Sequence, residues 1–253
     1  MSAIAHQYLQ SNSQSYVDFC NNFLYQGDAL YALIFERNND KIKVNKEKFA
    51  IKNLKKIFDA AFQLSAKSGF QAMSLRDLST ATGLSMGGLY SSISNKEAIA
   101  VIVKDVVSVV CAEIVEESRE QKDPKLALQV LMRGYLYAST LMQPWFYFLY
   151  FETKSLPSAD QEGSLKIELI QVKELETLIG SLISNTDTCH KAEFVATMAL
   201  SLIQERYLKH WKYKNAPETI DEYADKCLQL IYRAICLDEI EPCTQIYTSS
   251  PKN

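Results

Sequence analysis

The chain has 253 residues, of which 47% are hydrophobic and 23% charged, a composition that fits a soluble globular protein and excludes wholesale disorder. Only 8 Gly and 6 Pro occur, which leaves few turns for many short strands and favours long helices. No apolar run approaches the length of a transmembrane helix, and the N-terminus lacks a signal-peptide pattern. We therefore expect a cytoplasmic protein without a membrane partner.

Charge is distributed unevenly along the chain. Residues 1–40 carry a net charge of −3, residues 41–97 carry +6 from ten Lys or Arg and four Asp or Glu, and residues 98–253 carry −6. A basic segment within an acidic chain is either a solvated lysine face or a site for an anionic partner. Charge alone does not decide between these two interpretations.

The first 48 residues hold mixed signals. Apolar residues recur at helical spacing in the second half of 6–26. Residues 30–45 combine a dense apolar run, the turn signal Asn38-Asn39-Asp40 and an alternating stretch from Lys41 to Asn45. They fit a short hairpin and a helix followed by a charged linker equally well.

Residues 51–97 give the most specific pattern. Apolar side chains between 51 and 64 predict an amphipathic helix that Gly69 closes. Beyond it, Ser74 with Asp77 is a predicted N-terminal cap, Gly83 suits a tight turn, and Ser85 can cap a second short helix. Two short helices joined by a Gly turn, behind a longer helix, are typical of a helix-turn-helix.

The run from Ile51 to about Val103 resembles the N-terminal domain of the tetracycline-repressor (TetR/AcrR) family of transcriptional regulators. The matching segments are, in order, Ile57–Phe62, Ser68–Phe70, Ser74–Ser79, Thr82–Ser85, Gly87–Tyr90 and Ser94–Ile99. Ser79 and Ile93 depart from the usual Ala and Phe. The resemblance implies an all-α fold with a three-helix helix-turn-helix DNA-binding domain over 49–97 and a larger helical effector-binding and dimerisation domain over 98–253. It leaves residues 1–48 as an N-terminal extension of unknown role.

The second helix of such a motif lies in the major groove with its first residues against base edges. Two glycines in so short a helix cost about 2 kcal/mol of helix propensity, and either close packing or close approach to DNA would explain them. Arg76 is expected at a guanine edge or the backbone, and Lys96 at a phosphate. The predicted DNA-binding residues are Ser74, Arg76, Ser85, Met86, Gly87, Gly88, Tyr90, Ser91 and Lys96.

Long helices are predicted for the remainder, over 97–121, 124–142, 144–155, 160–185, 189–212 and 217–238. The aromatic run 144–151 is either ordinary core or part of a pocket for a small apolar or amphipathic effector. The candidate ligand residues are Tyr135, Trp145, Phe148, Phe151 and Glu152. Apolar stripes in 194–207 and 220–235 either face their own core or pair with a second copy as a homodimer.

Catalytic signals are weak. We find no nucleophile–base constellation, no phosphate loop and no useful metal-ligand spacing, since the adjacent Cys189 and His190 do not supply one. The sequence therefore predicts no enzyme, metal or cofactor. It predicts a ligand-responsive dimeric repressor that binds a near-palindromic double-stranded DNA operator. The alternative is a helical protein–protein interaction module that uses a borrowed helix-turn-helix.

Overall fold

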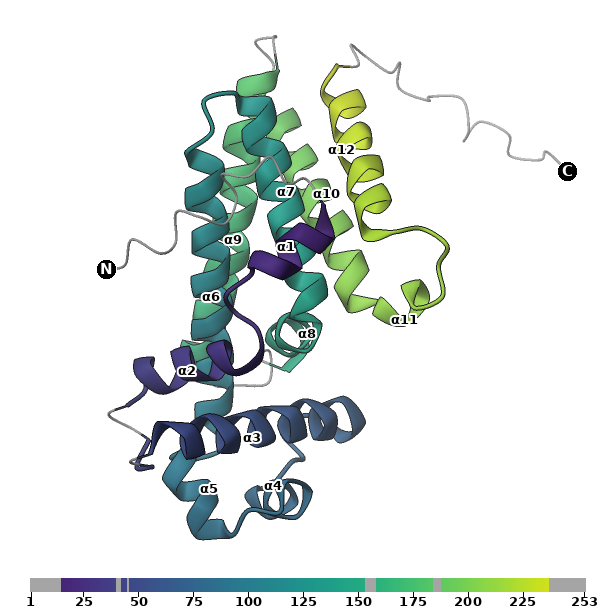
Figure 1. Ribbon diagram of the computed structural model, residues 1–253. Coiled ribbons are helices and arrows are strands. Elements are labelled where there is room, and N and C mark those ends of the chain that lie inside the picture. The colour runs from purple at the N-terminus through teal and green to yellow at the C-terminus, as the bar shows by residue number, and fades with distance from the viewer. Residues whose placement is uncertain (1–14, 40–41, 45, 153–157, 184–187, 237–253) are drawn as a thin grey trace, which may run out of the picture.

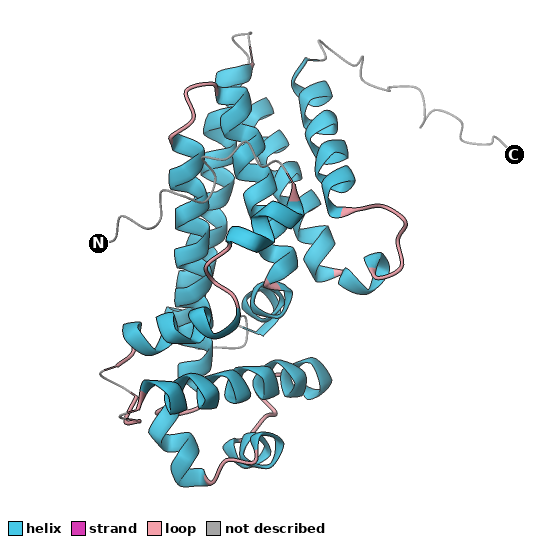
Figure 2. Cartoon of the chain, viewed as in Figure 1, coloured by secondary structure: helices cyan, strands magenta, loops and turns pink. Residues whose placement is uncertain are grey.

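The computed structural model describes residues 15–39, 42–44, 46–152, 158–183 and 188–236, with only the backbone for 158–165 and 188–190. All regular structure in these ranges is helical, as predicted (Figure 2). The helices are α1 Tyr16–Asn22, α2 Gly27–Arg37, α3 Glu47–Ser68, α4 Leu75–Thr82, α5 Met86–Ser92, α6 Glu97–Arg119, α7 Pro124–Leu141, α8 Gln143–Glu152, α9 Ser158–Leu182, α10 Thr188–Leu208, α11 His210–Tyr213 and α12 Ile220–Cys236. No helix in these ranges combines the length and the apolar character needed to cross a membrane.

Helices α3, α4 and α5 form a small unit at one end of the molecule (Figure 1). Ser74 and Asp77 make a reciprocal capping box at the start of α4. Gly83 adopts φ +68° between α4 and α5, a left-handed conformation that favours glycine. The side chain of Ser85 accepts the Gly88 N–H and caps α5. The predicted helix-turn-helix is therefore present with its predicted caps.

The other helices form a bundle next to this unit (Figure 1). Helix α6 leaves the helix-turn-helix and packs against α7, α8 and α9, and α12 packs against α10 and α7. The helix predicted over 189–212 is interrupted: α10 ends at Leu208, and a separate turn, α11, follows Lys209. This interruption matters because α11 approaches the C-terminal half of α3 around a cavity described below.

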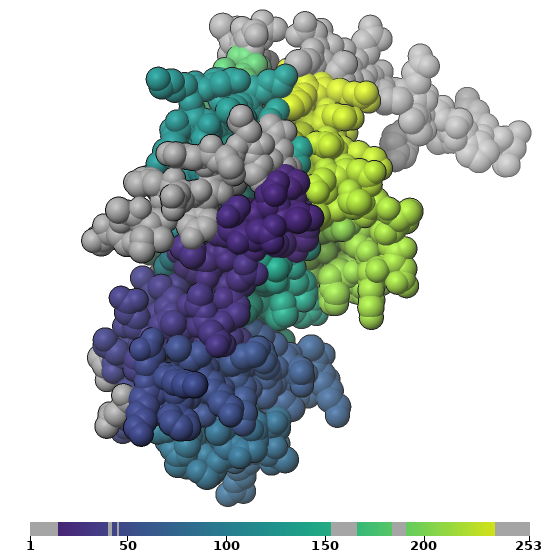
Figure 3. All heavy atoms as spheres, viewed as in Figure 1, coloured from purple at the N-terminus to yellow at the C-terminus, as the bar shows by residue number. Residues whose placement is uncertain are grey.

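The N-terminal extension is helical, so the helix is the correct alternative for residues 30–37 and the hairpin is wrong. Helix α2 packs on α3, and Tyr31 is buried against the rings of Phe58 and Trp145. Arg37 forms a bidentate ion pair with Asp105 on α6, with both contacts at 2.7 Å. Figure 3 shows this segment, in purple, lying between the helix-turn-helix end and the bundle.

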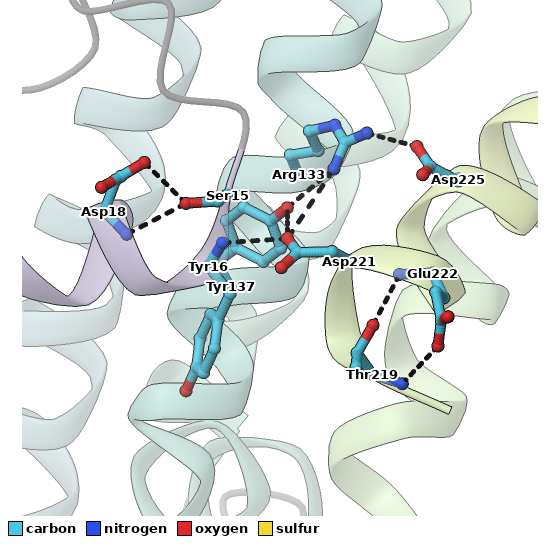
Figure 4. A network of polar contacts seen from close by, with 9 residues as sticks. All are labelled: Ser15, Tyr16, Asp18, Arg133, Tyr137, Thr219, Asp221, Glu222 and Asp225. Carbon is cyan, nitrogen blue, oxygen red and sulfur yellow. Dashed lines mark hydrogen bonds and ion pairs between the residues drawn. The ribbon is translucent and has the colours of Figure 1, made fainter. Parts of the chain in front are cut away.

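Helix α1 joins α7 and α12 through a polar network (Figure 4). The backbone N–H of Tyr16 donates to Oδ1 of Asp221 at 2.9 Å, and the Tyr137 hydroxyl donates to the same carboxylate. Arg133 donates to the Tyr137 hydroxyl at 2.7 Å and to the carboxylate of Asp225. Burial, together with the bond to Asp221, raises the pKa of Tyr137, so its hydroxyl keeps its proton. The extension thus contacts both the helix-turn-helix unit and the helical bundle.

Candidate functional site

The solvent-facing side of helix α5 is polar, and its two glycines leave part of the backbone without side-chain cover. Leu89 is fully buried and fixes the inner face of α5, whereas Tyr90 is 49% exposed and is not a core residue. Met86 is 36% exposed, and Arg76, in the first turn of α4, is also exposed. The start of α5 and the start of α4 therefore both offer side chains to an outside partner.

The glycines of α5 do not serve close packing. A Cβ added at Gly87 would meet nothing nearer than the Ser85 hydroxyl at 4.0 Å. One added at Gly88 would meet the same hydroxyl at 3.5 Å and Leu84 at 3.8 Å, which are ordinary contacts. Of the two explanations for these glycines, access to bare backbone is the one that fits.

The serine hydroxyls predicted to contact DNA differ in whether they already donate to a partner within the protein. Ser74 donates its hydroxyl to Asp77 at 2.7 Å, and its bonds to that carboxylate lower the pKa of Asp77. Ser91 donates its hydroxyl to the Gly88 carbonyl at 2.8 Å, and its own carbonyl accepts the Lys43 N–H. Ser85 acts as an acceptor in its cap, so this bond leaves its hydroxyl proton uncommitted.

Lys96 lies beside the helix-turn-helix but is held within the protein. Its ammonium donates to the Gln71 carbonyl at 3.0 Å and lies 5.2 Å from the centre of the Phe70 ring. Lys96 is the N-cap of α6, and the side chain of Asn95 accepts the Ala98 N–H at 2.9 Å. An ammonium has three donors, so Lys96 retains capacity for a further acceptor.

The lysines of α3 separate into two groups. Lys48, Lys52 and Lys56 are exposed. Lys55 pairs with Asp59 at 3.2 Å and lies over the Tyr31 ring, so it faces the N-terminal extension. Part of the positive charge of residues 41–97 is thus internally compensated.

The structure does not bring the five candidate ligand residues together. Tyr135 is 1% exposed in α7, and its hydroxyl has no hydrogen-bond partner among the described residues. Trp145 stacks on Phe58 with ring centres 4.9 Å apart and is core. Phe151 is 45% exposed, and its ring packs against those of Tyr147 and Tyr150.

Phe148 and Glu152, the other two candidates, line a cavity of about 360 Å³ between α3, α8 and the α10–α11 corner. Its lining residues are Phe62, Gln63, Ser65, Ala66, Gln143, Pro144, Tyr147, Phe148, Glu152, Leu208, His210 and Trp211. Sequence reasoning missed most of them because they come from three separate segments and share no local pattern.

Three large apolar side chains remain exposed on the two predicted dimerisation stripes. Phe194 and Met198 on α10 are 67% and 45% exposed, and Leu230 on α12 is 55% exposed. Most other members of the two stripes, including Val195 and Ile231, are buried in their own subunit. The stripes therefore serve mainly the core and leave a small apolar surface outside.

Metal ligands do not gather in the described part of the chain: no group of three or more His, Cys, Asp or Glu has the geometry to hold an ion there. The side chains of Cys189 and His190 lie outside the described residues.

The comparisons with known proteins agree with this architecture. Residues 57–101 match the family described as bacterial regulatory proteins, tetR family. A search of curated proteins finds no match.

Solved structures share the fold. The chain is similar to the TetR family transcriptional regulator PfmR from Thermus thermophilus, with 23% identity over 70% of this chain and 97% of that chain and a TM-score of 0.57. It is also similar to AibR in complex with isovaleryl coenzyme A and operator DNA, with 18% identity, coverage of 70% and 97%, and a TM-score of 0.58. The regulator FadR from Bacillus subtilis in complex with stearoyl-CoA is 15% identical, with coverage of 72% and 99% and a TM-score of 0.53. Residues 57–101 thus match the tetR family of bacterial regulatory proteins, and the chain shares the helical fold of solved transcriptional regulators.

Proposed function

We propose that the chain is a sequence-specific DNA-binding transcriptional regulator that reads the major groove with α5. The observation that carries the proposal is the start of α5, where Gly87 is bare and unpacked, Tyr90 is exposed and Leu89 anchors the helix from inside. A helix of this kind brings its first turn against base edges. Arg76 then adds a guanine or phosphate contact from the start of α4.

The proposed contacts follow from the donors that the structure leaves available. Arg76, Ser85, Met86, Gly87, Gly88 and Tyr90 form the reading surface. Ser74, Ser91 and Lys96 flank it, and their first role is to hold the motif, because each already has a partner inside the protein. Exposed lysines of α3 add attraction that falls steeply with salt.

We propose that the regulator acts as a homodimer on a near-palindromic operator and represses. Two helix-turn-helix units on one symmetric assembly read two half-sites. The exposed Phe194, Met198 and Leu230 support pairing through α10 and α12. A small-molecule effector bound in the helical bundle would shift the population of DNA-competent dimers. That AibR was solved with operator DNA and an acyl-CoA is in keeping with such a system.

The test is selection of bound fragments from genomic DNA by the full-length protein, followed by footprinting of the fragment with the highest affinity. We expect a protected site with two related half-sites and an affinity that decreases linearly with salt on logarithmic axes. Native mass spectrometry of the purified protein would report the subunit number and any small molecule that co-purifies. Failure to enrich any sequence above random DNA would contradict the proposal.

A further inference from the structure

We infer that the cavity between α3, α8 and the α10–α11 corner is a binding site for a compact, uncharged aromatic molecule that carries one hydrogen-bonding group. Four of the lining side chains are aromatic: Phe62, Tyr147, Phe148 and Trp211. Trp211 is 69% exposed, so the cavity reaches the surface there. A volume of about 360 Å³ lies at the lower end of the range for ligand pockets, which favours a compact molecule.

The aromatic lining favours a flat apolar ligand. The rings of Phe62 on α3 and Phe148 on α8 meet edge to face, with their centres 5.7 Å apart. Phe148 is buried, Phe62 is partly buried, and both already pack on neighbouring rings, which holds them in place. Aromatic rings prefer edge-to-face or offset contacts with one another, so a further ring from a ligand is the natural occupant of such a wall.

The charged groups of the lining already have partners within the protein. Among the lining residues, Glu152 and His210 can carry a charge near neutral pH. Oε2 of Glu152 accepts the backbone N–H of Phe70 at 2.8 Å, and Nδ1 of His210 lies 3.2 Å from Nε2 of Gln143. An ion that enters an aromatic cavity loses its hydration, and this loss is unfavourable unless a charge in the wall is directed at the ion. An uncharged ligand avoids that loss.

Ser65 supplies the polar contact of the proposed site. It is 5% exposed, it lines the cavity, and its hydroxyl has no hydrogen-bond partner among the described side chains and backbone groups. Most buried polar groups in proteins are satisfied, so an orphaned hydroxyl at a cavity wall is suited to a partner from outside. A hydroxyl both donates and accepts, so a phenol or an aryl alcohol can bond to it in either direction.

The cavity lies where the helix-turn-helix unit meets the bundle. Figure 1 shows α8 next to α3, and the two helices are in contact. Phe70, in the short link between α3 and α4, bonds to Glu152 through its N–H, and its ring meets that of Phe148 with centres 5.0 Å apart. A ligand between Ser65 and Phe148 therefore touches both units, and it should hold the link at Phe70 more firmly.

The proposal rests on the proposed function only for its regulatory consequence; binding itself can be measured without DNA. The probe is 2-naphthol, compared with naphthalene-2-carboxylate and 2-naphthylmethylammonium, by calorimetry on the full-length protein at neutral pH. We expect saturable binding of 2-naphthol with a Kd below about 0.5 mM, and binding of each ion at least about fivefold weaker. Equal or tighter binding of either ion, or no saturable binding of 2-naphthol at about 2 mM, would overturn the proposal.

Two pairs of variants locate the site. Ser65→Ala removes only the hydroxyl, so the Kd for 2-naphthol should rise at least about threefold. Ser118→Ala, a matched loss of a buried hydroxyl outside the lining, should leave that Kd unchanged. Ala66→Phe, at an exposed lining position, should block binding, whereas Ala112→Phe, at an exposed position of α6 outside the lining, should not. Wild-type affinity in Ser65→Ala or in Ala66→Phe would overturn the assignment of the site.

The stability of the two serine variants tests the orphaned hydroxyl without any ligand. Ser65→Ala should keep or raise the melting temperature, because it removes a buried hydroxyl that has no partner and introduces a better helix former. Ser118→Ala should lower the melting temperature, because Ser118 donates to the Ala127 carbonyl at 2.9 Å and that carbonyl would lose its partner. Equal decreases in both variants would show that the Ser65 hydroxyl is bonded within the protein and would overturn its role in the site.

Hydrogen exchange tests the connection to the helix-turn-helix. The Gly69 N–H donates to the Ser65 carbonyl at 2.8 Å, so the amides of Gly69 and Phe70 both report on the wall of the cavity. Saturating 2-naphthol should slow their exchange, and Ala66→Phe should abolish that change. Unchanged exchange in the wild-type protein, with 2-naphthol bound, would overturn the coupling. Because none of these measurements involves DNA, their failure leaves the genomic selection to judge the proposed function separately.

Discussion

At the scale of single residues, Gly87 lowers the stability of α5 but leaves the backbone of the helix accessible. Gly87→Ala should stabilise the protein by roughly 0.5–1 kcal/mol, because alanine is the better helix former and its Cβ meets no neighbour within packing distance. If α5 reads DNA as proposed, the same methyl group would stand between the backbone and the DNA and should weaken binding to the selected operator. Urea unfolding and fluorescence anisotropy measure the two effects.

Gly180→Ala is the matched control for Gly87→Ala. Gly180 lies in α9, and a Cβ there would meet only Ala192, at 3.8 Å, so the change should be tolerated in the same way. It should leave DNA binding unchanged. If Gly87→Ala bound the operator as tightly as the wild type, the close approach of α5 to DNA would be refuted.

Arg76 offers a separate test of base readout. Arg76→Ala should weaken binding to the selected operator by about 1–3 kcal/mol and binding to random DNA much less, because a bidentate contact to guanine carries sequence information and a phosphate contact does not. Lys67→Ala removes one exposed positive charge at the far end of α3 and serves as the control. Equal losses on both DNAs for Arg76→Ala would assign Arg76 to the backbone.

At the scale of secondary-structure elements, the N-terminal extension is the feature that the family resemblance does not cover. Tyr31 on α2 is 5% exposed between Phe58 on α3 and Trp145 on α8. Tyr31→Ala should therefore lower the unfolding free energy by about 3 kcal/mol, as other large-to-small aromatic changes in cores do.

Val17→Ala is the control for Tyr31→Ala, because Val17 lies in the same N-terminal extension but is 65% exposed. It should change stability by no more than about 0.5 kcal/mol. Thermal and urea unfolding provide the measurement. A small effect of Tyr31→Ala would mean that the extension lies on the molecule without stabilising it.

The C-terminal turns of α6 make stability depend on pH. Burial, with the nearby Glu120 and Glu113, raises the pKa of Glu117 to about 8. The folded state then binds a proton that the unfolded chain has lost, so stability should fall as pH rises from about 5 to about 8. Glu117→Gln should flatten this fall, whereas Glu116→Gln, which is exposed, should not. A wild-type melting temperature that rises over this interval would contradict the assignment.

Local signals predicted the elements well, and long-range packing explains what they missed. The cap at Ser74, the turn at Gly83 and the start of α7 at Pro124 each depend on a few adjacent residues, so the sequence reveals them. The choice between helix and hairpin for 30–37 depended on burial of Tyr31 against residues far along the chain. The cavity likewise required three segments to meet, and of the five candidate ligand residues only Phe148 and Glu152 line it.

At the scale of the whole molecule, the proposed homodimer depends on the exposed apolar side chains of α10 and α12. The chain has a mass of 28.7 kDa, and light scattering should report about twice that value. Leu230→Arg should shift the protein to the monomer, because a charge buried in an apolar interface without a partner is strongly unfavourable. The monomer should also lose most of its affinity for a two-half-site operator while each helix-turn-helix stays folded, since linkage of two binding units supplies much of that affinity.

Leu169→Arg distinguishes this interface from any other exposed apolar position. Leu169 on α9 is 65% exposed, comparable with the 55% of Leu230, and it carries the same substitution. We expect Leu169→Arg to remain dimeric and to bind the operator as the wild type does. If Leu169→Arg gave the monomer and Leu230→Arg did not, the subunits would pair through α9, and the spacing of the two α5 helices would have to be derived from that assembly instead.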